Sequence, residues 1–298
     1  MKIGFIGLGK MGGQMVTRLL NDGHEVHVVD LNQQAVDAAV AVGATQATDR
    51  QELIGRLERP VIWLMIPAQF VDTELDALLQ IVPPGTIIID GGNSDYRLTK
   101  QRATRTSEKS AYLVDVGTSG GILGMEKGFS MMVGGQKDAV ATIAPILESL
   151  AQPDGWKRFG NEGTGHYIKM VHNAIEYGMM QSYAEGYRLL KEGAYQDLDL
   201  AAIGKVWQHG SIINSLLNEV TVQALEENPE LDGIDGYVSE SGETRWALET
   251  AKELGIAMPS IEGSFNVRIA SQQGETNFAT KLLAAMRNKF GGHDINKS

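Results

Sequence analysis

The sequence predicts an α/β protein in which a doubly wound parallel sheet over residues 1–160 is followed by an all-helical domain over residues 161–298. The length of 298 residues suggests two domains, because one domain usually takes about 100 to 200 residues. Up to residue 160, short apolar runs alternate with helical patterns. Beyond Asn161 the apolar runs disappear and long helical patterns take their place.

The apolar runs of the first domain are continuous and do not alternate with polar residues. They are KIGFIG, EVHVVD, VIWLMI, TIIID, AYLVDV and FSMMVGG, and helical patterns such as MGGQMVTRLLNDG and QQAVDAAVAVG separate them. Continuous apolar strands are typical of a parallel sheet that helices cover on both faces.

The second domain is predicted to contain long helices over 164–192, 198–227, 244–254, 259–272 and 276–289. Segments rich in Gly and Pro, such as NPELDGIDG and GIAMP, separate several of them. The sequence shows no flexible linker between the domains, so we expect the first long helix to pack directly on the sheet domain.

The composition narrows the class of protein. The net charge of −11 argues against a nucleic-acid partner, because phosphate backbones are held by excess Lys and Arg. The chain has no Cys, which excludes thiolate chemistry and is consistent with a reducing cytoplasm. No apolar run approaches the roughly 18 residues of a membrane span, and the apolar start has no basic leader. We therefore expect a cytoplasmic protein that binds a small molecule.

The turn after the first apolar run carries a glycine pattern, Gly7, Gly9 and Gly12, at the start of a helix. Such glycines allow a tight turn, a close approach of the backbone to a pyrophosphate, and close packing of helix on strand. Asp30 ends the next run, where a carboxylate binds the adenosine ribose. The pattern predicts a Rossmann-type dinucleotide site, although a glycine turn that binds nothing is the alternative.

Asp30 also bears on the choice of cofactor, because a carboxylate repels the 2′-phosphate of NADP. The residues that follow, Leu31, Asn32, Gln33 and Gln34, include no Arg or Lys to neutralise that phosphate. The sequence therefore favours NAD over NADP.

Two further loops follow apolar runs, at the edge of the sheet where α/β proteins bind ligands. GGNS carries Asn93, whose amide both donates and accepts hydrogen bonds. GTSGG carries the Ser119 hydroxyl and the unhindered N–H groups of Gly120 and Gly121. Each loop alone has the sequence of a simple turn, but together beside a cofactor motif they indicate a binding site.

Lys169, His172, Asn173 and Glu176 follow one another at i, i+3, i+4 and i+7 in the first long helix, so they share one face. A base, an acid and two hydrogen-bonding groups on one face suggest a catalytic wall. The alternative is a solvated face with a Lys to Glu ion pair.

Three segments, IIIDGGNSDYRLT, DVGTSGG and GTGHYIKMVHNAIEYGMMQSYAE, resemble the signatures of the decarboxylating 6-phosphogluconate dehydrogenases, and the likeness runs from GLGKMG to FGGH. At this length the chain is similar to the short, NAD-preferring bacterial branch. The resemblance implies oxidative decarboxylation of 6-phosphogluconate to ribulose 5-phosphate and CO2, within gluconate utilization and the pentose phosphate pathway.

The resemblance also implies roles for single residues. Lys169 would be the general base and Glu176 the general acid, with His172 and Asn173 beside them. The residues implied to bind NAD are Gly7, Leu8, Gly9, Lys10, Met11, Gly12, Asp30, Met65, Pro67 and Asn93. Those implied to bind substrate are Asn93, Ser119, Gly120, Gly121, His172, Asn173, Tyr177, Arg268, Arg287 and His293.

Arg287 and His293 match the family's tail residues, which reach the phosphate in a neighbouring subunit, so a homo-oligomer, dimer or tetramer, is implied. The segment ESGETRW departs from the pattern of the long members. It has Ser241 and Glu243 where those members carry Lys and Thr, which puts phosphate contacts there in doubt, and Thr244 where short members usually have Gly.

The residue types also suit this chemistry. A neutral Lys169 would take the C3 hydroxyl proton and then, as an ammonium, stabilise the enediol left by CO2 loss, while Glu176 protonates C1. No metal is then required, since the ammonium does the polarising. One alternative is another β-hydroxyacid dehydrogenase, of the 3-hydroxyisobutyrate or tartronate semialdehyde type, which needs no such acid. A non-catalytic NAD-binding protein on the same fold is a second.

Overall fold

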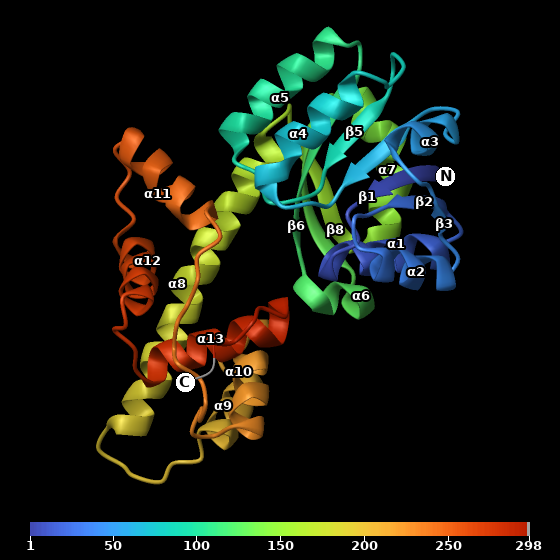
Figure 1. Ribbon diagram of the computed structural model, residues 1–298. Helices are drawn as coiled ribbons and strands as arrows, with labels where there is room; N and C mark the ends of the chain where they lie inside the picture. Colours follow the sequence, from blue (N-terminus) through green and yellow to red (C-terminus); the bar gives the residue numbers. More distant parts are fainter. Residues whose placement is uncertain (297–298) are drawn as a thin grey trace. The chain divides into compact units, whose positions relative to one another are not determined.

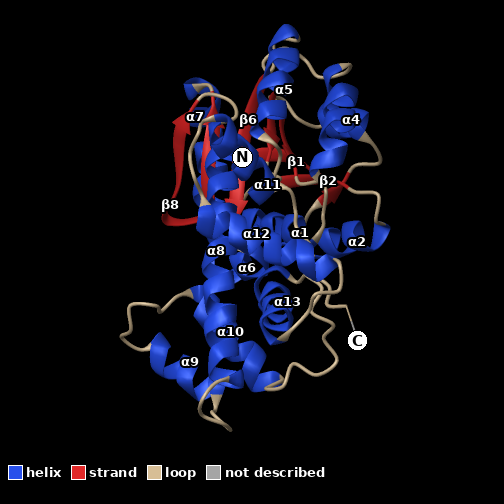
Figure 2. Ribbon diagram, turned by 90° about the vertical axis from the view of Figure 1, so that its left-hand side faces the viewer, coloured by secondary structure: helices blue, strands red, loops and turns tan. Residues whose placement is uncertain are grey.

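The structure, a computed structural model, describes residues 1–296, which divide into two compact units (Figure 1). Unit 1 spans Met1–Met170 and unit 2 begins at Val171. The strands lie in unit 1, and the described part of unit 2 is built from helices (Figure 2). The predicted fold class, a Rossmann-type sheet followed by a helical domain, is confirmed.

Within the described residues, unit 1 forms one eight-stranded sheet with the order β3-β2-β1-β4-β5-β6-β7-β8. The strands are β1 (Lys2–Ile6), β2 (Glu25–Val29), β3 (Thr45–Gln46), β4 (Val61–Leu64), β5 (Ile87–Asp90), β6 (Tyr112–Ser119), β7 (Phe129–Gly135) and β8 (Ala151–Gly160). Every predicted run became a strand. The neighbouring strands are parallel except β7, which is antiparallel to β6.

The expectation of a fully parallel sheet was therefore wrong at β7. Residues 120–128 connect β6 to β7 through the short helices η1 (Gly121–Leu123) and α6 (Gly124–Lys127). This connection is shorter than the dozen or more residues that a parallel crossover needs, so the chain turns back. The edge strands β3 and β8 were missed: β3 has only two residues, and AQPDGWKRFG of β8 contains Pro and Gly and is half exposed.

Helices cover both faces of the sheet, and single strands contribute to both cores. In β4, Val61 and Trp63 belong to one buried cluster, and Ile62 and Leu64 belong to the other. The first cluster packs against α1 (Lys10–Asn21), α2 (Gln33–Ala41) and α7 (Lys137–Leu150). The second packs against α3 (Arg50–Gly55), α4 (Ala68–Leu79) and, through a partly buried Ala103, α5 (Tyr96–Glu108). Burial on both faces explains the continuous apolar strands.

Helix α8 (Thr164–Glu192) begins in unit 1, directly on the sheet, as the missing linker predicted. The carboxylate of Asp115, a fully buried residue of β6, accepts hydrogen bonds from the N–H groups of Gly163 at 2.7 Å and His166 at 2.9 Å. A Cβ atom on Gly165 would lie 2.4 Å from the Met132 carbonyl oxygen, so the helix start touches the sheet backbone. These contacts hold the first turns of α8 in place.

Unit 2 continues α8 and adds α9 (Leu200–Gln208), α10 (Leu216–Glu227), α11 (Glu243–Glu253), α12 (Pro259–Gln272) and α13 (Phe278–Gly291). Its core joins side chains of α8, α10 and α13, including Tyr187, Leu225 and Leu283. The predicted single helix over 198–227 is wrong. Gly210 has a φ of +87°, and Ser215 accepts a hydrogen bond from the Asn218 N–H to begin α10. Among residues 1–296, no helix is both long and apolar enough to span a membrane.

We expect Asp115→Ala to lower the free energy of unfolding by about 2 to 4 kcal/mol, because two buried N–H groups lose their acceptor at a helix start. Chemical denaturation followed by tryptophan fluorescence measures this loss. Asp199→Ala is the matched control. Asp199 caps α9 at an exposed position, where a lost cap costs about 1 kcal/mol. An Asp115→Ala loss no larger than that of the control would contradict the anchoring role.

Candidate active site

The glycine turn between β1 and α1 has the geometry that a pyrophosphate requires. Gly7 has a φ of +100°, and a Cβ atom on it would lie 2.4 Å from the Met65 carbonyl oxygen, so no side chain fits there. Nothing lies within 4 Å of the Cβ position of Gly9, which leaves that side of the turn open. Gly9 is also the N-cap of α1, and because it has no side chain the first N–H groups of the helix remain for an anion.

Asp30 lies after β2, at the place predicted for a ribose carboxylate. Its two oxygens accept hydrogen bonds from the N–H groups of Leu8 and Asn32, which ties the end of β2 to the glycine turn. A carboxylate has about four acceptor positions, so it can accept further hydrogen bonds from a ligand. Leu31 beside it is fully exposed and brings no cation.

The other loops at this edge of the sheet follow β4, β5 and β6. Met65 donates its N–H to the Ile6 carbonyl at 2.8 Å, and Pro67 is the N-cap of α4. Asn93 is exposed between the buried residues Gly91 and Ser94. Because β4, β5 and β6 are neighbouring parallel strands, their carboxyl ends share one edge. Ser119 ends β6 at the same edge, and Gly120 and Gly121 follow it.

Lys169 lies on the part of α8 that packs on β6. Its side chain is buried, with 4% of its surface exposed. A Cβ atom on Gly117 would lie 2.3 Å from the Lys169 Cβ, so only glycine lets the helix come this close to the strand. Lys169 is thereby held beside Gly117, which lies two residues before Ser119 at the end of β6. A solvated Lys is excluded by this burial.

In unit 2, α8 carries His172, Asn173 and Glu176. The Asn173 side chain is 8% exposed, and its Nδ2 donates to Glu243 Oε1 at 2.9 Å, while its Oδ1 lies 2.9 Å from His172 Nδ1. Glu176 Oε2 lies 3.9 Å from His172 Nδ1, and about a quarter of the Glu176 side chain is exposed. Asn173 is therefore fixed by a partner on α11, and Glu176 remains open to solvent.

Arg268 and Arg287 lie in one buried cluster in unit 2. The Arg268 guanidinium stacks 3.2 Å above the centroid of the Tyr177 ring, and Arg287 Nη1 donates to Ser239 Oγ at 2.9 Å. Burial lowers the pKa of Arg268 to about 10, and the like charge of Arg287 adds to the lowering, while Tyr177 and Glu176 oppose it. Burial also lowers the pKa of Arg287. Two desolvated cations in one place are well suited to hold an anion.

The remaining residues that the sequence singled out are Arg287, His293 and Ser241, and each has a contact within this chain. Arg287, predicted to reach a neighbouring subunit, contacts Ser239 of its own chain. His293 is exposed after the end of α13, and its carbonyl accepts from Asn288 Nδ2 at 2.8 Å. Ser241 donates its N–H to the Tyr177 hydroxyl at 3.4 Å.

Sequence reasoning missed the partner that fixes Asn173. Glu243 was noted only as a departure at a phosphate position, yet it is buried, with 3% exposed, and accepts from Asn173. Its negative charge raises the pKa of Arg287 against the larger effect of burial. No local signal in ESGETRW indicates a residue on another helix, so this contact required the fold.

The fold and these groups are those of a dinucleotide-binding dehydrogenase: a glycine turn after β1, a carboxylate after β2 and a buried lysine beside the sheet edge. Comparison with known proteins gives the family. Residues 2–166 match the family model of the NAD binding domain of 6-phosphogluconate dehydrogenase. Residues 165–298 match the family model of the 6-phosphogluconate dehydrogenase C-terminal domain. The chain belongs to the 6-phosphogluconate dehydrogenase family.

Individual relatives agree with this assignment. A Haloferax volcanii protein named NAD(+)-dependent, decarboxylating 6-phosphogluconate dehydrogenase is 41% identical, over 99% of this chain and 98% of its own. A longer Bacillus subtilis protein of the same name is 34% identical, over 95% of this chain and 64% of its own. The solved structure of Plasmodium falciparum 6-phosphogluconate dehydrogenase matches with a TM-score of 0.83 at 30% identity, over 92% of this chain and 63% of that one.

Cofactor choice is testable by binding alone. We expect Asp30→Ser together with Leu31→Arg to tighten NADPH relative to NADH by about 10- to 100-fold, because a repulsive carboxylate is lost and a charged donor is gained. Fluorescence titration of both reduced cofactors gives the ratio. Leu31→Arg alone should gain less, since Asp30 still repels the phosphate. Equal binding of NADPH and NADH by the unmodified protein would contradict the role of Asp30.

Proposed function

We propose that the protein oxidatively decarboxylates 6-phosphogluconate to ribulose 5-phosphate and CO2 with NAD as the electron acceptor. The observation that carries the proposal is the buried arginine pair Arg268 and Arg287, in the unit whose helix also presents Glu176. Family membership and the name of the Haloferax volcanii relative support the same reaction.

The arginine pair explains a preference for a phosphorylated substrate. A phosphate dianion would offset the repulsion between the two guanidinium groups and replace the water that burial has removed from them. Arg268 also meets Tyr177, so its guanidinium has a fixed plane to present to phosphate oxygens. The net charge of the chain is −11, so this local pair must overcome an unfavourable overall field.

NAD fits the turn in unit 1, where Gly7 to Gly12 would hold the pyrophosphate and Asp30 the adenosine ribose; when bound it accepts the hydride removed from C3 of the substrate. Lys169 takes the proton of the C3 hydroxyl during oxidation. The Lys169 side chain is buried, which keeps bulk water away from this proton transfer.

The oxidised substrate is a 3-keto acid, whose carboxylate leaves as CO2. Protonated Lys169 then donates to the carbonyl oxygen and stabilises the enediol, which makes a metal ion unnecessary for polarisation. Glu176 protonates C1 as the enediol collapses to the ketone, and its open side gives a route for proton exchange with water. Asn173, fixed by Glu243, supplies a rigid amide for substrate hydroxyls, and His172 lies next to it.

Two other functions remain distinguishable from this one. A β-hydroxyacid dehydrogenase of another type needs no acid for C1 and no phosphate site, so Glu176 and the arginine pair disfavour it. The solved 3-hydroxyisobutyrate dehydrogenase of Salmonella typhimurium matches at 19% identity with a TM-score of 0.78, a likeness of fold alone. A non-catalytic NAD-binding protein would have no reason to bury Lys169 beside Gly117.

The proposal extends to a homo-oligomer in which a tail residue completes a neighbouring site. Arg287 is engaged within its own chain, which supports phosphate binding in cis. His293 is exposed and follows the last helix, so it is the better candidate for a residue shared between subunits.

We expect purified protein to oxidise 6-phosphogluconate with NAD and to release one CO2 per NADH, with unphosphorylated gluconate far poorer because it lacks the dianion. Coupled absorbance and CO2 trapping measure both products. Lys169→Met should lower turnover by about 10²- to 10⁴-fold while NADH binding stays near normal, and Glu176→Gln should be less severe. A stable keto acid without CO2, or equal use of gluconate, would overturn the assignment.

A mixing experiment tests the shared tail. His293→Ala should raise the Michaelis constant for 6-phosphogluconate and leave that for NAD nearly unchanged. When the inactive Lys169→Met chain is mixed with it under subunit exchange, tight use of 6-phosphogluconate should return in part, because a mixed oligomer pairs an intact lysine with an intact tail. Light scattering establishes the subunit number. A fully active monomer, or exchange without recovery, would rule the shared tail out.

A further inference from the structure

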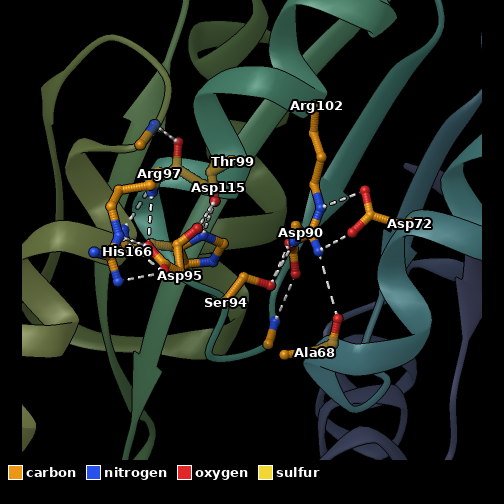
Figure 3. Close-up of polar contacts among 12 residues, drawn as sticks. Ala68, Asp72, Asp90, Ser94, Asp95, Arg97, Thr99, Arg102, Asp115 and His166 are labelled. Carbon is orange, nitrogen blue, oxygen red and sulfur yellow. Dashed lines mark hydrogen bonds and ion pairs between the residues drawn. The ribbon is translucent and has the colours of Figure 1, made fainter. Parts of the chain in front are cut away.

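Arg102 is a buried arginine of α5 with no role in the chemistry above. Only 1% of it is exposed, and it lies at the centre of a polar cluster in unit 1 (Figure 3). Its Nη2 donates to Asp72 Oδ2 at 2.7 Å and to the Ala68 carbonyl at 3.4 Å. Its Nη1 donates to Ser94 Oγ at 2.9 Å and to Asp90 Oδ2 at 3.3 Å. One guanidinium thus contacts four residues from two different loops and their adjoining elements.

These partners belong to the two loops at the carboxyl ends of β4 and β5. Ala68 and Asp72 form the first turns of α4, immediately after Pro67. Asp90 ends β5, and its oxygens also accept from the Ser94 hydroxyl at 2.8 Å and the Gly92 N–H at 3.3 Å. Asn93, the exposed residue of this loop, is therefore flanked by two residues that Asp90 holds.

The cluster is electrostatically matched. Asp90 is fully buried, and a buried carboxylate is costly unless a cation and hydrogen-bond donors surround it. The Arg102 guanidinium supplies that cation and also holds the pKa of Asp72 below its usual range. Arg105, one turn further along α5, forms ion pairs with Asp72 and Asp76 at the surface and does not reach the loops.

The position of these loops in the sheet indicates which part of a dinucleotide they meet. In a doubly wound sheet, the first half around β1 and β2 holds one nucleoside and the second half around β4 and β5 holds the other. Asp30 belongs to the first half, where adenosine binds. Loops 65–68 and 91–94 belong to the second half, where the nicotinamide nucleoside binds.

We propose that Arg102 is a positioning residue for the nicotinamide half of the cofactor: it does not touch NAD, but it locks loops 65–68 and 91–94 into one binding shape. The proposal rests on the NAD-dependent function proposed above. Helix α5 also contacts the start of α8, the helix that carries Lys169. Thr99 Oγ1 lies 2.8 Å from His166 Nδ1, at the start of α8, and the His166 N–H donates to Asp115 (Figure 3).

Binding without substrate tests this role. We expect Arg102→Met to raise the dissociation constant of NADH by about 10- to 100-fold, because small displacements of binding groups have effects of that order. ADP-ribose, which lacks nicotinamide, should bind within about threefold of normal, since its contacts lie in the other half of the sheet. Arg102→Lys keeps the positive charge but not the several N–H donors of the guanidinium, so its NADH dissociation constant should lie between those of the unmodified protein and Arg102→Met. Arg105→Gln is the matched control and should change neither constant.

The binding stoichiometry separates positioning from loss of fold, because unfolded protein lowers the number of sites and not their affinity. If Arg102→Met does not fold, Ser94→Ala decides, since it removes the hydrogen bonds of Ser94 Oγ to Asp90 and Arg102 and leaves the ion pair of those two residues in place. It should weaken NADH about 2- to 10-fold and spare ADP-ribose. Unchanged NADH affinity in a folded variant, or equal weakening of NADH and ADP-ribose, overturns the proposal. Failure to turn over 6-phosphogluconate would instead overturn the proposed function and leave this test intact.

Discussion

The hydrogen bonds from the start of α8 to Asp115 are the interaction on which the site in unit 1 depends. They place a helix N-terminus against β6 and β7, where Gly117 and Gly165 allow a close approach between helix and strands. Because a helix is rigid over a few turns, anchoring its first turn also determines where Lys169 lies. This anchoring also explains why Lys169 is buried, because Lys169 lies about one turn beyond the anchored start and so stays against the sheet.

Asp115 and Asp90 are register partners on the neighbouring strands β6 and β5, and both are fully buried. Two carboxylates so placed would destabilise the sheet if they shared one counter-charge. The fold gives each its own. Asp90 receives the Arg102 guanidinium and the Ser94 hydroxyl, whereas Asp115 receives N–H groups at the positive end of a helix dipole. The two carboxylates therefore fix different parts of the site: Asp90 fixes the loop after β5, and Asp115 fixes the start of α8.

The sequence predicted the elements whose pattern is local. Continuous apolar strands, the glycine turn and α8 were all predictable because burial on both faces, a φ of +100° at Gly7 and helical periodicity leave marks within a few residues. The break between α9 and α10 was missed, although Gly210 and Ser215 were visible signals. The antiparallel β7 depended on the length of a connection, and the partners of Asn173 and Asp90 depended on tertiary structure. The acidic residues ending TIIID and lying within AYLVDV are the signal that could have been weighed more, because a charge in a buried strand requires a partner.

Unit 2 shows how an acidic chain can be suited to an anionic ligand. Long-range attraction is absent, so affinity must come from short-range contacts after water has been removed. Burial of Arg268 and Arg287 raises the energy of the cluster before any ligand binds, as the pKa of Arg268 near 10 indicates. Under the proposed function, a phosphate dianion would recover that energy, whereas the unphosphorylated end of a sugar acid would not. Glu176 opposes the lowering of both arginine pKa values and Glu243 opposes that of Arg287, so carboxylates of the same chain partly compensate the two cations. In the proposed function, selectivity for a phosphorylated substrate would therefore come from desolvation in the folded protein and not from net charge.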